Sequence, residues 1–254
     1  MTMMARLPQF LLTEEVLDGL DVASPGGAEF TFASGRATFR RTLEPLAAGR
    51  YSEAAGYFHP MIPALLPKKD RPLYLRHRTR DFYLDYLEEE DALYVQYNLA
   101  LQPTDDFADD VERLFRRRRP AKVIVDVRHN PGGDNFTYES LVSTLAAIGK
   151  EGRVYVLLGR GTFSAAGHFV IDLMKRSDVR LVGERSGFAP NQFGDPDSTW
   201  LAASGLTVNT GAVEWIKTRR DDRSLWLEPD VTVRVSAADY FGGRDPVLDA
   251  AVDD

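Results

Sequence analysis

Val123-Ile-Val-Asp-Val-Arg-His-Asn-Pro-Gly-Gly133 is the stretch that decides the fold. Its valine and isoleucine residues form a run that is too continuous for a strand with one solvated face, so they predict a central, largely parallel strand buried on both faces. The Asn-Pro-Gly-Gly segment then ends the strand. Two adjacent glycines tolerate positive φ and let the backbone approach a ligand, so this loop can direct N–H groups at a developing negative charge. A tight turn without a ligand is the ordinary alternative.

A second apolar run, Val154 to Leu158, is broken by Gly159-Arg-Gly161 and followed by Thr162-Phe-Ser-Ala-Ala166. Apolar residues then recur at helical spacing, which places Ser164 at or just before the N-terminus of a helix. The ordinary role of a serine at this position is an N-cap. The functional alternative is a nucleophile whose transition-state charge is met by nearby N–H groups. That alternative requires both turns at one edge of the sheet, which a right-handed helical crossover over residues 138–148 provides.

The two stretches resemble the paired signature of the C-terminal processing, or tail-specific, serine proteases, including their tricorn-type and retinoid-binding-protein-like branches. The resemblance runs from about Leu93 to the C-terminus. The segments that carry it are 125–133, 162–166, Gly183-Glu-Arg-Ser-Gly187, Glu228-Pro-Asp230 and Arg244-Asp-Pro-Val-Leu248. It implies an α/β fold with a Clp-protease/crotonase-like core, built from ββα units around a mostly parallel sheet, in a serine peptidase that acts on a peptide or on the C-terminus of a protein.

The resemblance also implies the roles of site residues. Ser164 would be the nucleophile, and the N–H groups of Ala165 and of Gly132 or Gly133 would bind the oxyanion. Thr162 is assigned to substrate binding. Asn191 is assigned either to substrate contact or to holding its own loop through an Asx-turn.

The general base does not follow the family pattern. In the processing proteases a lysine supplies it, and alignment brings that position to or near Ala189, while no lysine lies between Lys175 and Lys217. The tricorn-like branch uses a histidine from a segment upstream of the core. The four histidines are therefore the candidates, and they are His59, His77, His129 and His168. His129 is the best placed of the four because it adjoins the glycine loop, although structural polar packing is its ordinary role there. His168, one turn after Ser164, is expected to be a partly exposed helix residue.

A serine hydroxyl without a base is a poor nucleophile, so two further functions stay open. The first is a catalytically inactive relative that binds a peptide or a small apolar ligand. The second is a crotonase-like acyl-CoA enzyme, which would share the two-N–H oxyanion site. The histidines lack metal-ligand spacing, so neither a metal nor another cofactor is expected.

The sequence predicts a β-rich N-terminal part, residues 1–103, followed by the α/β core, residues 104–254. A buried pair of Asp126 and Arg128 is expected to shape the glycine loop. The remaining expected elements are a hairpin over 29–39, strands over 82–86 and 93–97, an amphipathic helix ending at Arg116-Arg-Arg-Arg119, a third buried strand over 179–182, a long loop near the site over 183–197, strands over 206–216 and 226–235, and a helix over 247–252.

Composition excludes several classes of function. The chain of 254 residues has a net charge of −7, which argues against a surface for nucleic acid. It contains no cysteine, so disulfides and thiolate metal sites are excluded. The N-terminus has neither the pattern of a signal peptide nor an apolar run long enough to span a membrane, and the sequence leaves both the compartment and the oligomeric state open.

Overall fold

The computed structural model describes residues 17, 21, 27–44, 66–151, 153–203 and 206–254. The chain forms two compact units, residues 2–62 and residues 63–254. In the smaller unit, β1 (Ala28–Ser34) and β2 (Ala37–Leu43) form the antiparallel hairpin that the sequence predicts. Gly35 has a φ of +60° at the turn, where a left-handed conformation is needed.

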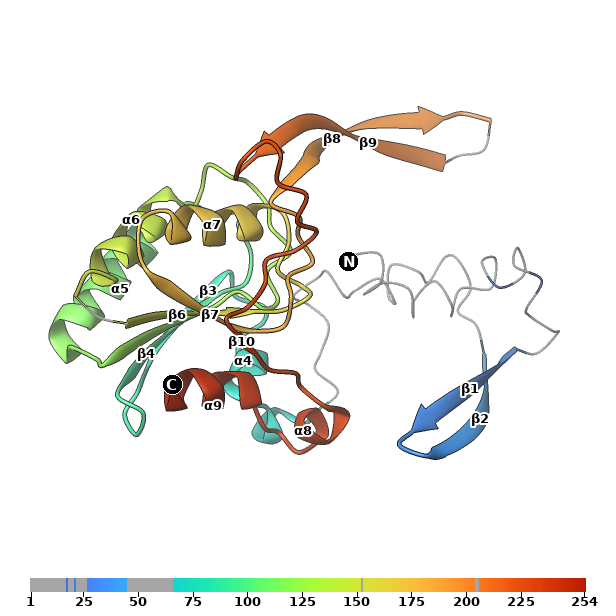
Figure 1. Ribbon diagram of the computed structural model, residues 1–254, viewed down its shortest axis with the longest axis horizontal. Helices are drawn as coiled ribbons and strands as arrows, with labels where there is room; N and C mark the ends of the chain where they lie inside the picture. Colours follow the sequence, from blue (N-terminus) through green and yellow to red (C-terminus); the bar gives the residue numbers. More distant parts are fainter. Residues whose placement is uncertain (1–16, 18–20, 22–26, 45–65, 152, 204–205) are drawn as a thin grey trace. The chain divides into compact units, whose positions relative to one another are not determined.

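The larger unit is built on a six-stranded sheet in the order β10-β7-β6-β5-β4-β3 (Figure 1). All neighbouring pairs are parallel except β3 and β4, so the expected mostly parallel sheet is confirmed. Two strands before residue 104, β3 and β4, belong to the same sheet as β5, β6, β7 and β10. The strands are β3 (Phe82–Leu87), β4 (Ala92–Tyr97), β5 (Lys122–Asp126), β6 (Arg153–Leu158), β7 (Val179–Gly183) and β10 (Val231–Thr232).

Helices cover both faces of this sheet (Figure 1). On one face lie α5 (Asp105–Arg118), α6 (Glu139–Ile148) and α7 (Ala165–Met174), and on the other lie α4 (Leu73–Arg76) and α9 (Pro246–Asp253). The short α8 (Ala237–Phe241) and a 3₁₀ turn, η3 (Lys68–Asp70), complete the helices of the described residues. None of these helices is long and apolar enough to cross a membrane.

Alternate residues of the central strands enter two separate cores. Val123 and Val125 of β5 pack under α5, α6 and α7, whereas Ile124 packs on the side of α9. Period-two alternation explains how one continuous apolar run serves both faces. The β5 strand is therefore buried in the centre of the sheet, as its sequence predicts.

Two predicted elements are wrong. The expected loop over 183–197 ends early, because β8 (Asn191–Leu201) starts inside it and pairs with β9 (Leu206–Ile216) to form a two-stranded ribbon that extends from the rest of this unit (Figure 1). The expected strand over 226–235 is reduced to the two residues of β10. Pro229 has no N–H for a ladder, and the Leu227 N–H instead donates to Ser186 Oγ at 2.8 Å.

Candidate active site

Ser164 lies at the start of α7, after β6, with a φ of 52° and a ψ of −126°. Positive φ is uncommon for a residue with a side chain, and such strain is concentrated at functional sites. The ordinary N-cap role is not observed, because the Ser164 side chain forms no capping hydrogen bond. The hydroxyl therefore makes no hydrogen bond to the first turn of α7.

The glycine loop lies directly against this serine. Gly132 has a φ of +102°, and a Cβ placed on it would lie 2.6 Å from Ser164 Cβ and 2.8 Å from Ala165 N. Only glycine allows that approach. The loops after β5 and β6 therefore meet at the carboxyl ends of two adjacent parallel strands, as the sequence predicts.

Asn130 fixes the conformation of both loops. Its Nδ2 donates to Tyr97 O at 3.1 Å, and its Oδ1 accepts from Gly132 N at 2.9 Å. Its carbonyl oxygen accepts from Phe163 N at 3.0 Å, next to the serine. The sequence analysis missed this residue, although an asparagine directly before Pro-Gly-Gly is a signal for such an Asx-turn.

The N–H groups of Ala165 and Gly133 lie near Ser164, the first in a buried residue and the second in an exposed one. The Gly132 N–H is taken by Asn130, while the backbone on both sides of Gly133 is held by Ala100, which donates to Gly132 O and accepts from Asp134 N. Within the described ranges, no hydrogen-bond acceptor is found for the N–H of either Ala165 or Gly133. An oxyanion is generally stabilised by N–H donors of this kind, and the assignment of these two groups to that role stays a prediction.

The two residues assigned to substrate binding make structural contacts. Thr162 is fully buried, and its hydroxyl donates to Val127 O at 2.8 Å and accepts from Gly159 N at 3.2 Å. Asn191 Nδ2 donates to Arg219 O at 2.7 Å, while its Oδ1 accepts from Lys217 N at 3.0 Å. Asn191 thus holds the base of the ribbon, and substrate contact by either residue stays a prediction.

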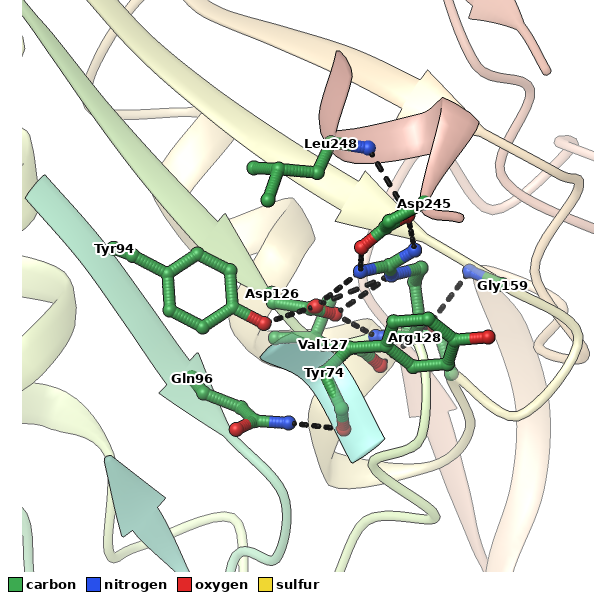
Figure 2. A network of polar contacts seen from close by, with 10 residues as sticks. Tyr74, Tyr94, Gln96, Asp126, Val127, Arg128, Gly159, Asp245 and Leu248 are labelled. Atoms are coloured by element: carbon green, nitrogen blue, oxygen red, sulfur yellow. Dashed lines mark hydrogen bonds and ion pairs between the residues drawn. The ribbon is translucent and has the colours of Figure 1, made fainter. Parts of the chain in front are cut away.

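A buried ion triad anchors the start of the glycine loop (Figure 2). Arg128 forms ion pairs of 2.6 Å with both Asp126 and Asp245, and its guanidinium lies 4.3 Å from the ring centroid of Tyr74. Burial alone would raise the pKa of Asp126, but the adjacent Arg128 outweighs it and lowers that pKa below its ordinary value. The predicted pair is confirmed, and Asp245 joins it to the N-cap of α9.

For three of the histidines, the structure shows no hydrogen bond to Ser164 or does not describe the residue. His129 is exposed, its ring stacks on Tyr74 at 5.5 Å, and no hydrogen bond joins it to Ser164 among the described residues. His77 stacks on Tyr83 of β3 at 3.7 Å. His59 lies outside the described residues.

His168 is not a partly exposed helix residue, as was expected, because only 1% of it is exposed. Its Nδ1 lies 2.6 Å from Asn135 Oδ1, and its ring contacts Phe188 and Trp215, with centroids 5.0 and 5.1 Å away. Its Nε2 has no hydrogen-bond partner among the described residues. His168 is buried because the loop after Gly133 and the base of the ribbon cover this face of α7.

Lys217 also lies near this face of α7. Its Nζ contacts Asp172 Oδ2 at 2.5 Å and the Tyr138 hydroxyl at 3.5 Å. The ammonium is therefore held as the partner of a carboxylate. Among the described residues, no group of three His, Asp or Glu side chains is placed to hold a metal ion.

Comparison with known proteins identifies the fold. Neither a family model nor a curated protein matches the sequence. A candidate peptidase from Parabacteroides merdae ATCC 43184 has a TM-score of 0.53 at 19% identity, covering 94% of this chain and 81% of its own. Mature CPAF, solved with lactacystin, has a TM-score of 0.56 at 12% identity, covering 89% and 67%.

A third structure is more distant. The photosystem II D1 C-terminal processing protease has a TM-score of 0.40 at 18% identity over 60% of this chain, which spans less than half, 45%, of that protein. At these identities the likeness is one of fold. The α/β fold that the motifs imply is confirmed by the first two structures.

Proposed function

We propose that this chain, which shares its fold with the candidate peptidase from Parabacteroides merdae, is a serine peptidase that cleaves peptides through Ser164. One observation carries the proposal. Ser164 precedes α7 with positive φ, and its hydroxyl makes no capping hydrogen bond to the helix. Gly132 packs against its Cβ, and two N–H groups nearby have no acceptor among the described residues. A serine that only capped α7 would need none of these features.

The chemistry follows from this arrangement. Ser164 Oγ attacks the carbonyl carbon of the scissile bond, and the N–H groups of Ala165 and Gly133 donate to the oxygen as it becomes negative. Such donors act strongly because they are already oriented before the reaction, and losing one typically lowers kcat by about 10²–10³. The α7 N-terminus adds its positive end to the same oxygen.

The surroundings of the glycine loop favour a peptide with apolar side chains. Phe136, three residues after Gly133, is 86% exposed, and Leu101 is 56% exposed. A Cβ placed on Gly133 would lie 3.2 Å from Leu101 Cδ2, so this apolar side chain borders the loop directly. Large exposed apolar groups beside a polar reaction centre are suited to hold the side chains of a bound peptide, as they are at interaction sites generally.

Labelling with a fluorophosphonate, read by intact mass, tests the nucleophile. We expect one adduct on the wild type and none on Ser164→Ala. Ser236→Ala is the matched control, because Ser236 is a true N-cap that accepts from Asp239 N at 3.1 Å on α8. This control should remove a helix cap and leave labelling unchanged.

An inactive, ligand-binding relative is the second candidate function. It is favoured by one observation, that no described histidine or lysine is hydrogen-bonded to the Ser164 hydroxyl. A folded wild type that gives no adduct at any pH, yet binds an apolar peptide, would contradict the peptidase and support this alternative.

A further inference from the structure

His168 lies on α7, one turn after Ser164. The His168 N–H donates to Ser164 O at 3.0 Å, which is the first i to i−4 bond of the helix and places the two residues one turn apart. A helical side chain such as that of His168 leans toward the helix N-terminus, and Ser164, with its φ of 52° and ψ of −126°, stands directly before that N-terminus. The imidazole of His168 therefore leans back toward the serine.

The glycine loop lies against both residues. Gly132 packs against Ser164 Cβ, and Asn135, three residues later on the same loop, contacts His168 Nδ1. A single short loop thus contacts both Ser164 and His168.

The contact with Asn135 assigns the tautomer of His168. An amide oxygen only accepts hydrogen bonds, so Nδ1 must carry the proton and Nε2 must carry the lone pair. That lone pair belongs to an almost fully buried ring and has no partner among the described residues. A buried acceptor without a donor is costly, and in a native structure it calls for a functional explanation.

The charged groups around the ring keep it neutral. Burial and then the ammonium of Lys217 lower the pKa of His168 to about 4, while Asp172 acts in the opposite direction and Lys175 in the same one. Lys217 itself is engaged by Asp172, so it is less suited than the imidazole to accept a proton. At neutral pH, His168 therefore keeps an unprotonated ring nitrogen one turn along α7 from Ser164.

We propose that His168 is the general base of this site, accepting the Ser164 hydroxyl proton at Nε2, and that Asn135 is the residue that positions its ring. The proposal rests on the peptidase function proposed above. The base comes from within the core, four residues after the nucleophile, and neither an upstream histidine nor a lysine after the third buried strand is needed.

The reaction balances with these groups and one water. The Oγ–H bond breaks as the new C–O bond forms, the proton goes to Nε2, and the carbonyl π electrons move to oxygen. Collapse of this intermediate breaks the C–N bond, and the leaving amine takes the proton from Nε2. Water then attacks the acyl-enzyme and gives its proton to Nε2, which returns it to Oγ as the ester bond breaks.

The test is the pH dependence of the fluorophosphonate labelling rate of the full chain. For the wild type we expect the rate to fall on acidification with a midpoint well below the ordinary histidine pKa of about 6.5. His168→Gln should label at least 100-fold more slowly, whereas Ser236→Ala, which removes the N-cap of α8, is the control and should label at the wild-type rate. Each variant is checked for folding by circular dichroism and thermal unfolding.

Asn135→Asp separates positioning from mere packing. A carboxylate beside Nδ1 stabilises the imidazolium, so labelling should persist while its acid midpoint rises by more than one pH unit. A structural role for Asn135 would leave the midpoint where it is. If His168→Gln fails to fold, the acid midpoint of Asn135→Asp still tests whether His168 is the base.

The outcomes distinguish this inference from the proposed function. If the wild type labels and Ser164→Ala does not, the peptidase site stands whatever the histidine variants show. Wild-type labelling of a folded His168→Gln variant, or an unchanged acid midpoint in Asn135→Asp, would then overturn His168 as the base. No labelling of the folded wild type at any pH would overturn both proposals.

Discussion

At the scale of single residues, the site depends on backbone conformations that ordinary residues resist. Ser164 has positive φ despite its side chain, and Gly132 has positive φ within contact distance of it. The two conformations support one another, because the glycine loop occupies the space beside the serine. A substitution that adds a single carbon there should therefore affect the chemistry more than the fold.

Gly132→Ala is the direct test of that close approach. The new methyl group would have to displace Ser164 Cβ and Ala165 N, so we expect a loss of labelling of about 10²-fold, the scale of a lost oxyanion donor. Gly35→Ala is the control, since Gly35 also has positive φ but has no atom within 4 Å of the added Cβ. Equal labelling rates for the two variants would show that backbone strain alone, and not contact with the serine, decides the effect.

His168 should also make stability depend on pH. Its pKa is about 4 in the folded chain against 6.5 ordinarily, so between these values the unfolded chain binds more protons. The free energy of unfolding should therefore fall as pH drops from 6.5 to 4, by up to about 3 kcal/mol from this residue. The stabilisation from Asp126 is lost only at lower pH, below its ordinary pKa of 3.8, because its folded pKa is lowered.

Urea unfolding at several pH values measures this effect. The wild type should lose more stability between pH 6.5 and 4 than His168→Gln does, and the difference between the two slopes isolates His168 from the other histidines. Parallel slopes would mean that the ring is protonated as easily in the folded chain as in the unfolded chain.

At the scale of elements, the C-terminal helix is joined to the glycine loop through one carboxylate. Asp245 caps α9 by accepting from Leu248 N at 3.2 Å, and it pairs with Arg128, which begins the loop after β5 (Figure 2). Asp245 and Arg128 lie 117 positions apart in the chain. The last helix is thereby part of the support for the candidate site.

Two substitutions of Asp245 separate these roles. We expect Asp245→Ala to lower the free energy of unfolding by about 3–5 kcal/mol, as breaking a buried ion pair does, and Asp245→Asn to cost about 1 kcal/mol less because it keeps the cap. Asp249→Ala, at an exposed position of the same helix, should change it by no more than about 0.5 kcal/mol. The ion triad would be unimportant if all three variants unfolded alike in denaturant.

The elements that were predicted correctly are those whose structure is determined by residues adjacent in the sequence. The β-branched runs of β5 and β6 and the hairpin turn at Gly35 carry their structure in adjacent residues. The ribbon does not, because β8 is rich in Gly, Pro, Asp and Asn, and its strand conformation comes from pairing with β9. Likewise, the burial of His168 depends on Asn135 and Trp215, which no helical pattern within α7 reveals.

At the scale of the whole molecule, the larger unit contains every described part of the candidate site. The six strands, the glycine loop, Ser164 and His168 all lie within residues 63–254. Both sheet cores are formed inside this unit as well. If His168 is the base, the reaction needs no group from residues 1–62, which contain one histidine, His59.

A chain shortened to Pro63–Asp254 tests that independence. We expect it to unfold cooperatively, with a Tm within a few degrees of the full chain, because the apolar surfaces of its sheet are covered by its own helices. It should react with the fluorophosphonate at the rate of the full chain, and the same short chain carrying Ser164→Ala should not react. A folded short chain that reacts more than tenfold more slowly would show that residues 1–62 take part in the reaction, and would favour His59 over His168 as the proton acceptor.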